Sequence, residues 1–357
     1  MSETAACGHG GAPPEETAVP QPTRPGVLGS PARGRVWGLT VCTLVLAVPA
    51  ALLFVRLTGM DDGTQLAVPM VLFPHSAALA LLVLGATTAV RPLRSRAVAA
   101  VASALVVAQV CLVAPRFFPD SAAPVPPSAA RLRVATVNTD EGAVDPLAVV
   151  GMVRAGRIDV LAVEQTPAMG LDALDRAGLG DLLPYHALRP EYDSSIYSRY
   201  PLSRPDTADI DTVWPQTTAR IEVGGRTVRL VAVHTYYPLG SAGRWARDMS
   251  ALASLAREEG PDTVFLGDFN ATLDHAPMRS LLAAGLTDTH AELGQGWAPT
   301  WPVGAGMAPP LVQLDHVLHG PGLAGVRVGE RSLAGTDHRA VVAELAVLPA
   351  GDASPES

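Results

Sequence analysis

Three long apolar runs dominate the first third of the chain, at Val36–Val55, Leu66–Val90 and Ala97–Ala114. A helix needs about 20 apolar residues, with a range of roughly 17 to 25, to cross the hydrocarbon core of a bilayer. None of the runs separates a polar face from an apolar one, as a helix on a water-soluble core would. We therefore expect three transmembrane helices over residues 36–114. A cleaved secretory signal is the alternative for the first run.

The segments that flank these runs set the expected topology. Residues 1–35 are rich in Gly, Pro, Ala and Glu, which predicts a disordered tail. Arginines tend to stay on the cytoplasmic side. They cluster before the first run and between the second and third, at Arg24, Arg33, Arg35, Arg91, Arg94 and Arg96. The tail is therefore predicted to be cytoplasmic, and residues 131–357 extracytoplasmic. The proline-rich residues 115–130 predict an extended linker that holds the following domain away from the last helix.

From Leu132 onward the pattern changes to short apolar strands separated by helices and turns. The expected strands include LRVATVN, IDVLAVEQ and VFLGDFN, and Gly224-Gly225 is a hairpin signal between two others. A helix is expected from about Ser241 to Glu258, where apolar residues recur at helical spacing. Many strands with few helices between them predict an α/β domain over residues 131–357. In it, mixed β-sheets stack face to face with helices outside.

Polar residues follow the ends of these apolar strands. In VFLGDFN, residues 264–270, a buried strand ends at a glycine, and an aspartate and an asparagine follow. The same arrangement recurs at other strand ends, and the residues concerned are Asn138, Asp140, Glu164, His234, Asp268, Asn270, Asp315, Asp337 and His338. Singly, such a residue has an ordinary alternative as a turn cap, a core histidine or a surface ion pair. Together they predict one polar site at the rim of the sheets.

Charge and ligand type narrow the chemistry of this site. All 26 basic residues are arginine, and residues 131–357 hold 18 arginines against 28 acidic residues, a net charge of −10. Such a domain lacks the basic surface that grips nucleic acid along its length, so nucleic acid is a disfavoured substrate. None of the three cysteines lies in the domain, which excludes a thiolate metal site. Oxygen ligands favour Mg²⁺, or Mn²⁺, and Glu164 is the best single ligand candidate.

The order of the motifs N-x-D, E-Q, H, G-D-x-N, L-D-H and D-H resembles that of the endonuclease/exonuclease/phosphatase superfamily, over roughly residues 131–345. The resemblance implies a four-layered α/β sandwich, consisting of two mixed β-sheets flanked by helices, and a Mg²⁺-dependent phosphoester hydrolase. On the metal side it places Glu164, with Asn138, Asp140 and Asp337 close to it. A metal ion and an imidazolium could then share the charge that develops on a phosphate.

The same resemblance implies roles for the remaining residues. Asp268 would orient or deprotonate the attacking water, and Asn270 would contact the phosphate. His338 would bind phosphate or act as acid and base, held by Asp315, and His234 matches a second histidine that only some members have. The sequence departs from the family pattern at DSSIYSRYP, where Asp193, Ser194 and Tyr197 all remain open as participants.

Apolar helices followed by an external domain are similar to the architecture of actinobacterial membrane proteins of this superfamily that are linked to teicoplanin-type glycopeptide resistance. The expectation is thus a membrane-anchored, outward-facing phosphatase or phosphodiesterase that acts on a lipid-linked or envelope phosphoester. A secreted-side nuclease is the alternative among enzymes. A non-catalytic binding module on the same scaffold is the alternative outside them.

Overall fold

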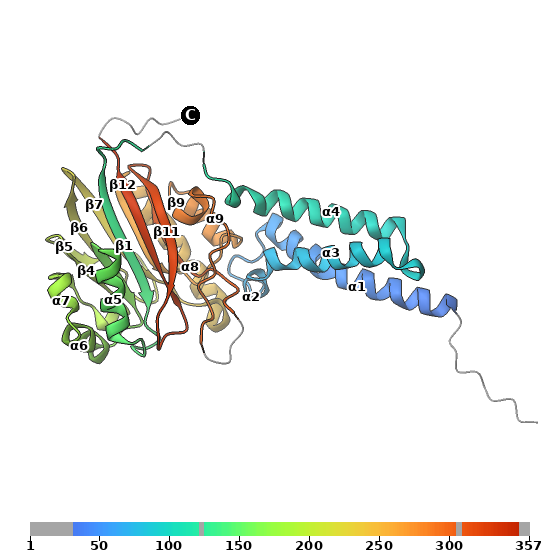
Figure 1. The fold of residues 1–357 in the computed structure, drawn as a ribbon, viewed down its shortest axis with the longest axis horizontal. Helices are drawn as coiled ribbons and strands as arrows, with labels where there is room; N and C mark the ends of the chain where they lie inside the picture. Colours follow the sequence, from blue (N-terminus) through green and yellow to red (C-terminus); the bar gives the residue numbers. More distant parts are fainter. Residues whose placement is uncertain (1–30, 121–124, 305–308, 350–357) are drawn as a thin grey trace, which may run out of the picture.

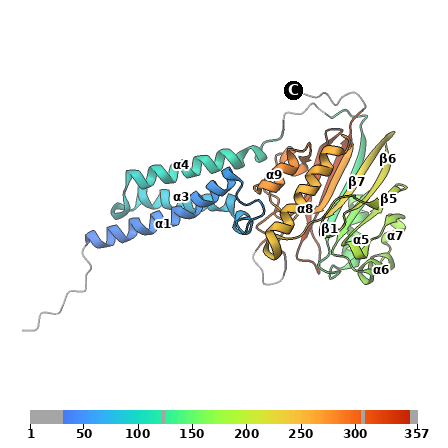
Figure 2. The same ribbon diagram turned by 180° about the vertical axis from the view of Figure 1, so that it is seen from behind.

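The computed structural model describes residues 31–120, 125–304 and 309–349, and the molecule is elongated (Figure 1). A bundle of apolar helices lies at one end, and a sandwich of β-sheets and helices lies at the other (Figures 1 and 2). The change from one part to the other follows the change in hydrophobic pattern along the sequence.

The helical bundle consists of α1 (Pro31–Thr58), α3 (Phe73–Ala89) and α4 (Arg96–Val113). Within the described residues, two helical segments are long and apolar enough to cross a membrane, Arg33–Thr58 and Arg96–Phe117. With 17 residues α3 is shorter, so the third predicted span is not confirmed. Helix α1 begins inside the segment predicted to be a disordered tail, and residues 1–30 of that segment lie outside the described part.

The second apolar run does not form the single helix predicted over Leu66–Val90. It is divided into the short helix α2 (Ala67–Met70) and α3, and the chain turns between them. Pro74 occupies the first turn of α3, where a proline is tolerated because the N–H that it lacks would have no intrahelical partner. The turn places α2 between the two parts of the molecule: Met70 packs with Leu52 and Val55 of α1, whereas Ala67 packs in the apolar core of the sandwich.

The described strands form two six-stranded mixed sheets, as the sequence predicts. The first has the order β11 (Leu323–Ser332), β12 (Arg339–Val347), β1 (Ala130–Asn138), β2 (Val160–Glu164), β4 (Ser194–Ser198) and β3 (Tyr185–Ala187). The second has the order β5 (Ser203–Thr207), β6 (Thr217–Val223), β7 (Arg226–His234), β8 (Thr263–Asp268), β10 (Asp315–His319) and β9 (Thr287–Asp288). The pairs β1–β2 and β7–β8 are parallel, and the other pairs are antiparallel.

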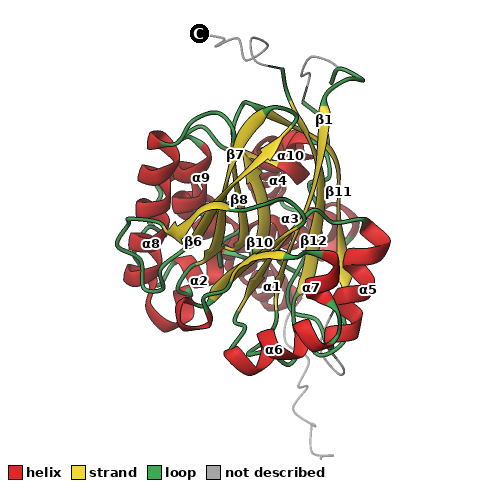
Figure 3. Cartoon of the chain, turned by 90° about the vertical axis from the view of Figure 1, so that its left-hand side faces the viewer, coloured by secondary structure: helices red, strands yellow, loops and turns green. Residues whose placement is uncertain are grey.

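Helices cover the outer face of each sheet, which gives four layers (Figure 3). Helices α5 (Pro146–Gly156), α6 (Ala168–Arg176) and α7 (Leu179–Leu182) cover the first sheet, and α8 (Pro238–Glu258) and α9 (Ala276–Leu282) cover the second. In β8, Val264 and Leu266 face the core between the sheets, while Phe265 faces the core beneath α8 and α9. The strand is buried on both faces, which explains its unbroken apolar pattern.

The bundle contacts the sandwich directly at the end of α4. The guanidinium of Arg116, in the 3₁₀ turn Ala114–Phe117 that continues α4, donates to the buried carboxylate of Asp274. The backbone N–H of Asp120 donates to the carbonyl oxygen of Glu292 at 2.9 Å. The prediction that residues 115–130 hold the domain away from the last helix is therefore wrong. A largely buried arginine without a partner is costly, so the pairing of Arg116 with Asp274 favours contact between the bundle and the sandwich.

Candidate active site

The strand ends converge at one rim of the sandwich. In the parallel pair β1–β2, Asn138 lies opposite Glu164, and in the parallel pair β7–β8, His234 lies opposite Asp268. Antiparallel β10 begins at Asp315, which also lies opposite Asp268. Parallel strands present their carboxyl ends at the same edge of a sheet, and in open α/β sheets this is where ligands bind. Register thus brings together residues from distant parts of the sequence.

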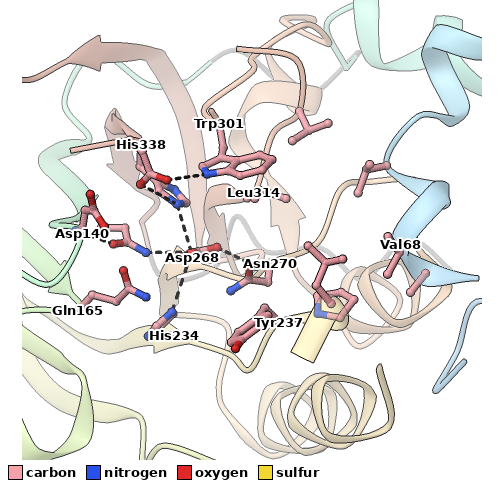
Figure 4. Close-up of a pocket in the computed structure, with 17 residues that line it drawn as sticks. Val68, Asp140, Gln165, His234, Tyr237, Asp268, Asn270, Trp301, Leu314 and His338 are labelled. Atoms are coloured by element: carbon pink, nitrogen blue, oxygen red, sulfur yellow. Dashed lines mark hydrogen bonds and ion pairs between the residues drawn. The ribbon is translucent and has the colours of Figure 1, made fainter. Parts of the chain in front are cut away.

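Asp268 lies at the centre of the rim (Figure 4). Its Oδ2 atom accepts a hydrogen bond of 3.0 Å from Nδ2 of Asn138, which joins the two sheets. Nε2 of His234 and Nε2 of His338 lie 4.0 and 3.9 Å from the same oxygen. The Oδ1 atom accepts from the backbone N–H of Asn270 at 2.8 Å. The carboxylate is therefore fixed in orientation between two imidazoles.

Each of the two histidines is held by its own aspartate. Nδ1 of His338 lies 2.8 Å from Oδ2 of Asp315, and Nδ1 of His234 lies 2.8 Å from Oδ2 of Asp193. A hydrogen bond at Nδ1 fixes the orientation of the imidazole ring, so that its Nε2 atom points away from the aspartate that holds it. Both Nε2 atoms face Asp268, so the site contains two histidine–aspartate pairs on opposite sides of one carboxylate (Figure 4).

The structure resolves the choice that the sequence left open at DSSIYSRYP. Asp193 is the partner of His234, whereas Oγ of Ser194 accepts a hydrogen bond from the backbone N–H of Thr217. Tyr197 is fully buried in the apolar core under the first sheet. Asp193 has φ +64°, and this left-handed conformation is one that aspartate tolerates better than most residues. Only Asp193 therefore belongs to the site.

Burial and neighbouring charges shift the pKa values of the ionisable groups in the site. Burial raises the pKa of Glu164 well above 4.5, and the neighbouring carboxylate of Asp315 raises it further. Burial also raises the pKa of Asp268. For His338, burial lowers the pKa, but the carboxylates of Asp315 and Asp268 outweigh burial and raise it to about 10. His338 is thus an imidazolium at neutral pH, suited to donate to a phosphate oxygen.

The donor set fits a hard divalent cation. Oε2 of Glu164 and Oδ1 of Asp315 are buried and have no hydrogen-bond partner among the described residues. A buried carboxylate oxygen without a partner is costly unless it is protonated or meets a cation. Asp315 also lies in one close group with Asp268 and His338, in which one polar side-chain atom of each lies within 4.8 Å of the others, and Glu164 is not part of this group. Glu164 and Asp315 would therefore hold the ion, which would supply positive charge to a phosphate.

A pocket of about 360 Å³ opens over this cluster. Seven of the nine predicted residues line it, namely Asn138, Asp140, His234, Asp268, Asn270, Asp337 and His338. The other two, Glu164 and Asp315, are fully buried and do not line the pocket. The structure therefore brings all nine to the same rim, in two layers. Of the predicted metal-side residues, Asp337 accepts from Nε1 of Trp301 at 2.9 Å, and Asn138 already bonds Asp268.

Several pocket residues carry no signal in the sequence that identifies them. Gln165 directly follows the predicted metal ligand, and Trp301 contributes its indole from a loop. Tyr237 lies beside the site, three residues after His234. Val68 and Val71 come from the α2 segment, about sixty residues before the sandwich begins with β1. Their apolar run was interpreted only as a transmembrane span, so sequence reasoning missed its contribution.

Comparison with known proteins agrees with this geometry. A model described as "Endonuclease/Exonuclease/phosphatase family" matches residues 135–338. An endonuclease/exonuclease/phosphatase family protein from Bacteroides thetaiotaomicron is similar in structure, with a TM-score of 0.51 and 16% identity over 62% of this chain and 99% of that one. Humanized D. rerio TDP2 gives a TM-score of 0.52 at 16% identity, over 60% of this chain and 98% of that one. These two likenesses concern the fold alone. No curated protein matches the sequence.

Proposed function

The chain belongs to the endonuclease/exonuclease/phosphatase family and is a metal-dependent phosphoester hydrolase, and we propose that it uses Mg²⁺ to hydrolyse a membrane-associated phosphoester. The observation that carries the choice of metal is the unpartnered buried oxygen of Glu164, in a site whose other candidate ligands are carboxylate oxygens of Asp268 and Asp315. Such oxygen ligands suit Mg²⁺, with Mn²⁺ as a substitute, better than softer metals.

In the proposed mechanism the protein positions the phosphate and the attacking water. Asp268, fixed by Asn138 and Asn270, orients the water and takes its proton. His338, held as an imidazolium by Asp315, donates to a phosphate oxygen. His234, held by Asp193, faces the same space from the opposite side. The bound metal ion would stabilise the negative charge on the phosphate.

We propose that the chain is anchored in the cell membrane, with its N-terminus in the cytoplasm and the sandwich outside. This orientation needs an odd number of crossings, which the two helices of membrane-spanning length would provide together with α3, the shorter apolar helix between them. The arginines at the flanks of these helices support a cytoplasmic N-terminus. The substrate would be a polyprenyl pyrophosphate, a phospholipid or a lipid-linked intermediate of the cell envelope. A phosphatase on such an intermediate would also fit a role in glycopeptide resistance, for which the likeness in architecture to teicoplanin-resistance proteins is the support.

The test is hydrolysis by the purified full chain of polyprenyl pyrophosphate, phospholipids and duplex DNA, with Mg²⁺ and with chelator. We expect Mg²⁺-dependent release of phosphate from a lipid substrate. Asp268→Ala and His338→Ala should each lower turnover by at least about a hundredfold while the protein stays folded. Wild-type turnover in both variants would overturn the mechanism. Activity on DNA that falls steeply with added salt would instead indicate the nuclease.

A further inference from the structure

The pocket over the catalytic cluster has two chemically different ends (Figure 4). Charged and amide side chains, among them Asp140, Gln165 and Asp268, gather at one end. Figure 4 shows Val68 at the other end. The apolar part of the lining comes from three separate segments and consists of Val68, Val71, Leu239, Val312 and Leu314. A phosphate group needs only the polar end, so the apolar end is available to whatever is attached to the phosphate.

Helix α2 supplies one wall of the apolar end, and the sandwich holds this wall in place. Ala67 is fully buried in the same apolar cluster as Trp245 and Met249 of α8. The carbonyl oxygen of Ala67 lies 3.0 Å from Nε2 of buried His275. Just before α2, Oδ2 of Asp61 accepts from the backbone N–H of Ala276 at 2.7 Å. The wall is therefore a fixed part of the site rather than a loose turn of the chain.

The side chains that this wall presents are apolar and accessible. Val68 and Val71 are only half-buried, unlike Ala67 and Met70 on the other face of the segment. Figure 4 shows Val68 across the pocket from Asp140 and Gln165, with Asn270, Tyr237 and Leu314 between. Both valines line the pocket, and part of each side chain is exposed in the described structure.

The same segment leads directly into the apolar helices. Only two residues separate Met70 from α3, and Met70 and Phe73 are buried with Leu52 and Val55 of α1. Leu72, at the turn between α2 and α3, is 46% exposed. Leu72, exposed beside the bundle, and Val68 and Val71, which line the catalytic pocket, are therefore neighbours on one short segment of the chain.

We infer that α2 forms a subsite for an apolar chain attached to the scissile phosphoester, so that the N-terminal helices take part in substrate selection as well as in anchoring. This inference rests on the proposed function, and it assigns a role to a segment outside residues 135–338, the part that matches the family. Each methylene that moves from water into apolar contact favours binding by roughly fourfold. Contact with a few methylenes is therefore enough for the site to bind a long-chain phosphoester well over tenfold more tightly than a short-chain one.

The test compares two ligands that share a phosphate and differ in chain length, dodecyl phosphate and ethyl phosphate. Binding is measured by calorimetry in Mg²⁺, with the full chain in nanodiscs and ligand below its micellar concentration. We expect wild type to bind dodecyl phosphate at least tenfold more tightly. The double variant Val68→Asn with Val71→Asn should lose most of this preference and keep its affinity for ethyl phosphate.

Leu147→Asn is the matched control, because Leu147 is 69% exposed on α5, outside the pocket. All three proteins share the same nanodisc, so nonspecific partitioning cancels in the comparison. A preference that is unchanged in the double variant, or equal losses for both ligands, would overturn the inference. Failure of the proposed function would be seen separately, as binding preference without any metal-dependent hydrolysis.

A second measurement needs no substitution and therefore does not depend on the folding of a variant. Dodecyl phosphate with a photoreactive diazirine on the chain is bound to wild type, irradiated, and mapped by mass spectrometry. Labelled peptides should include residues 66–72, and excess unlabelled dodecyl phosphate should suppress the labelling. Labelling that excludes this segment would place the chain elsewhere and refute the subsite.

Discussion

The carboxylate of Asp274 accepts two hydrogen bonds from the guanidinium of Arg116, at 2.7 and 3.1 Å. Arg56, near the end of α1, lies 3.3 Å from the same carboxylate. Asp274 belongs to the loop that follows β8, four residues after Asn270 of the active site. One buried carboxylate therefore joins two helices of the bundle to the loop that leaves the catalytic rim.

Asp274→Ala should destabilise the protein by about 3–5 kcal/mol, because it leaves two largely buried guanidinium groups without their partner. Thermal and chemical unfolding in detergent would measure the loss. The control is Glu344→Ala, which breaks the more exposed pair with Arg133 and should cost less than about 1 kcal/mol. Equal losses in the two variants would show that Asp274 does not join the two parts.

Glu164→Gln separates metal binding from folding. Burial disfavours the charged form of Glu164 and raises its pKa in the folded protein. At a pH above the pKa of glutamate in the unfolded chain, this group therefore lowers the stability of the folded protein. In chelator at pH 7 the glutamine variant should therefore be more stable than wild type, and the difference should vanish below the usual pKa of about 4.3. In calorimetry its affinity for Mg²⁺ should fall at least about tenfold. Unchanged Mg²⁺ affinity would remove Glu164 from the metal site.

Gly267→Ala should disrupt the strand pair that positions His234 and Asp268. Gly267 has φ +150°, and a Cβ atom there would overlap the carbonyl oxygen of Val233 on the neighbouring strand. Since backbone atoms cannot move aside as a flexible side chain does, we expect a loss of about 3 kcal/mol or more, with loss of activity.

Gly151→Ala is the control for this substitution. Gly151 lies within α5, and a Cβ atom there would meet nothing within 4 Å. Alanine is the better helix former, so this variant should gain roughly 0.5–1 kcal/mol in denaturant unfolding. A Gly267→Ala variant as stable and active as wild type would refute the close approach of β7 and β8.

Glu330→Gln tests a hydrogen bond between a glutamate and a histidine outside the catalytic rim. Burial raises the pKa of Glu330, but the hydrogen bond from His290, with 2.7 Å between Nε2 and Oε1, outweighs it and lowers the pKa below 4.5. A carboxyl group with a lowered pKa adds stability above its unfolded pKa and loses it as the pH falls through the folded value. The variant should be about 1 kcal/mol less stable at pH 7 and approach wild type below pH 4, roughly. Thermal unfolding across this range, with exposed Glu222→Gln as control, measures the difference. A loss of stability that does not depend on pH would contradict a lowered pKa of Glu330 as its cause.

Hydrophobic pattern alone predicted the sandwich and most of its site. A strand buried on both faces, such as VFLGDFN, cannot place polar groups until it ends, so Asp268 and Asn270 had to lie at a sheet rim. The same reasoning placed Asn138, Glu164 and His234 at strand ends, and the observed register brought these ends together. What local pattern requires of each strand was therefore enough to predict a shared polar site.

Which side chains contact one another across the site could be seen only in the tertiary structure. The pairing of Asp193 with His234 joins residues 41 positions apart, and no local spacing distinguishes Asp193 from Ser194. The turn that places Val68 at the catalytic pocket lies in an apolar run that Pro69, Pro74 and His75 interrupt. Prolines also occur in kinked membrane-spanning helices, so these residues did not distinguish one kinked span from two separate helices. The local sequence determines which residues are buried within a strand and which polar residues lie at its end. Contacts between distant segments depend on how the layers pack, and only the folded chain decides them.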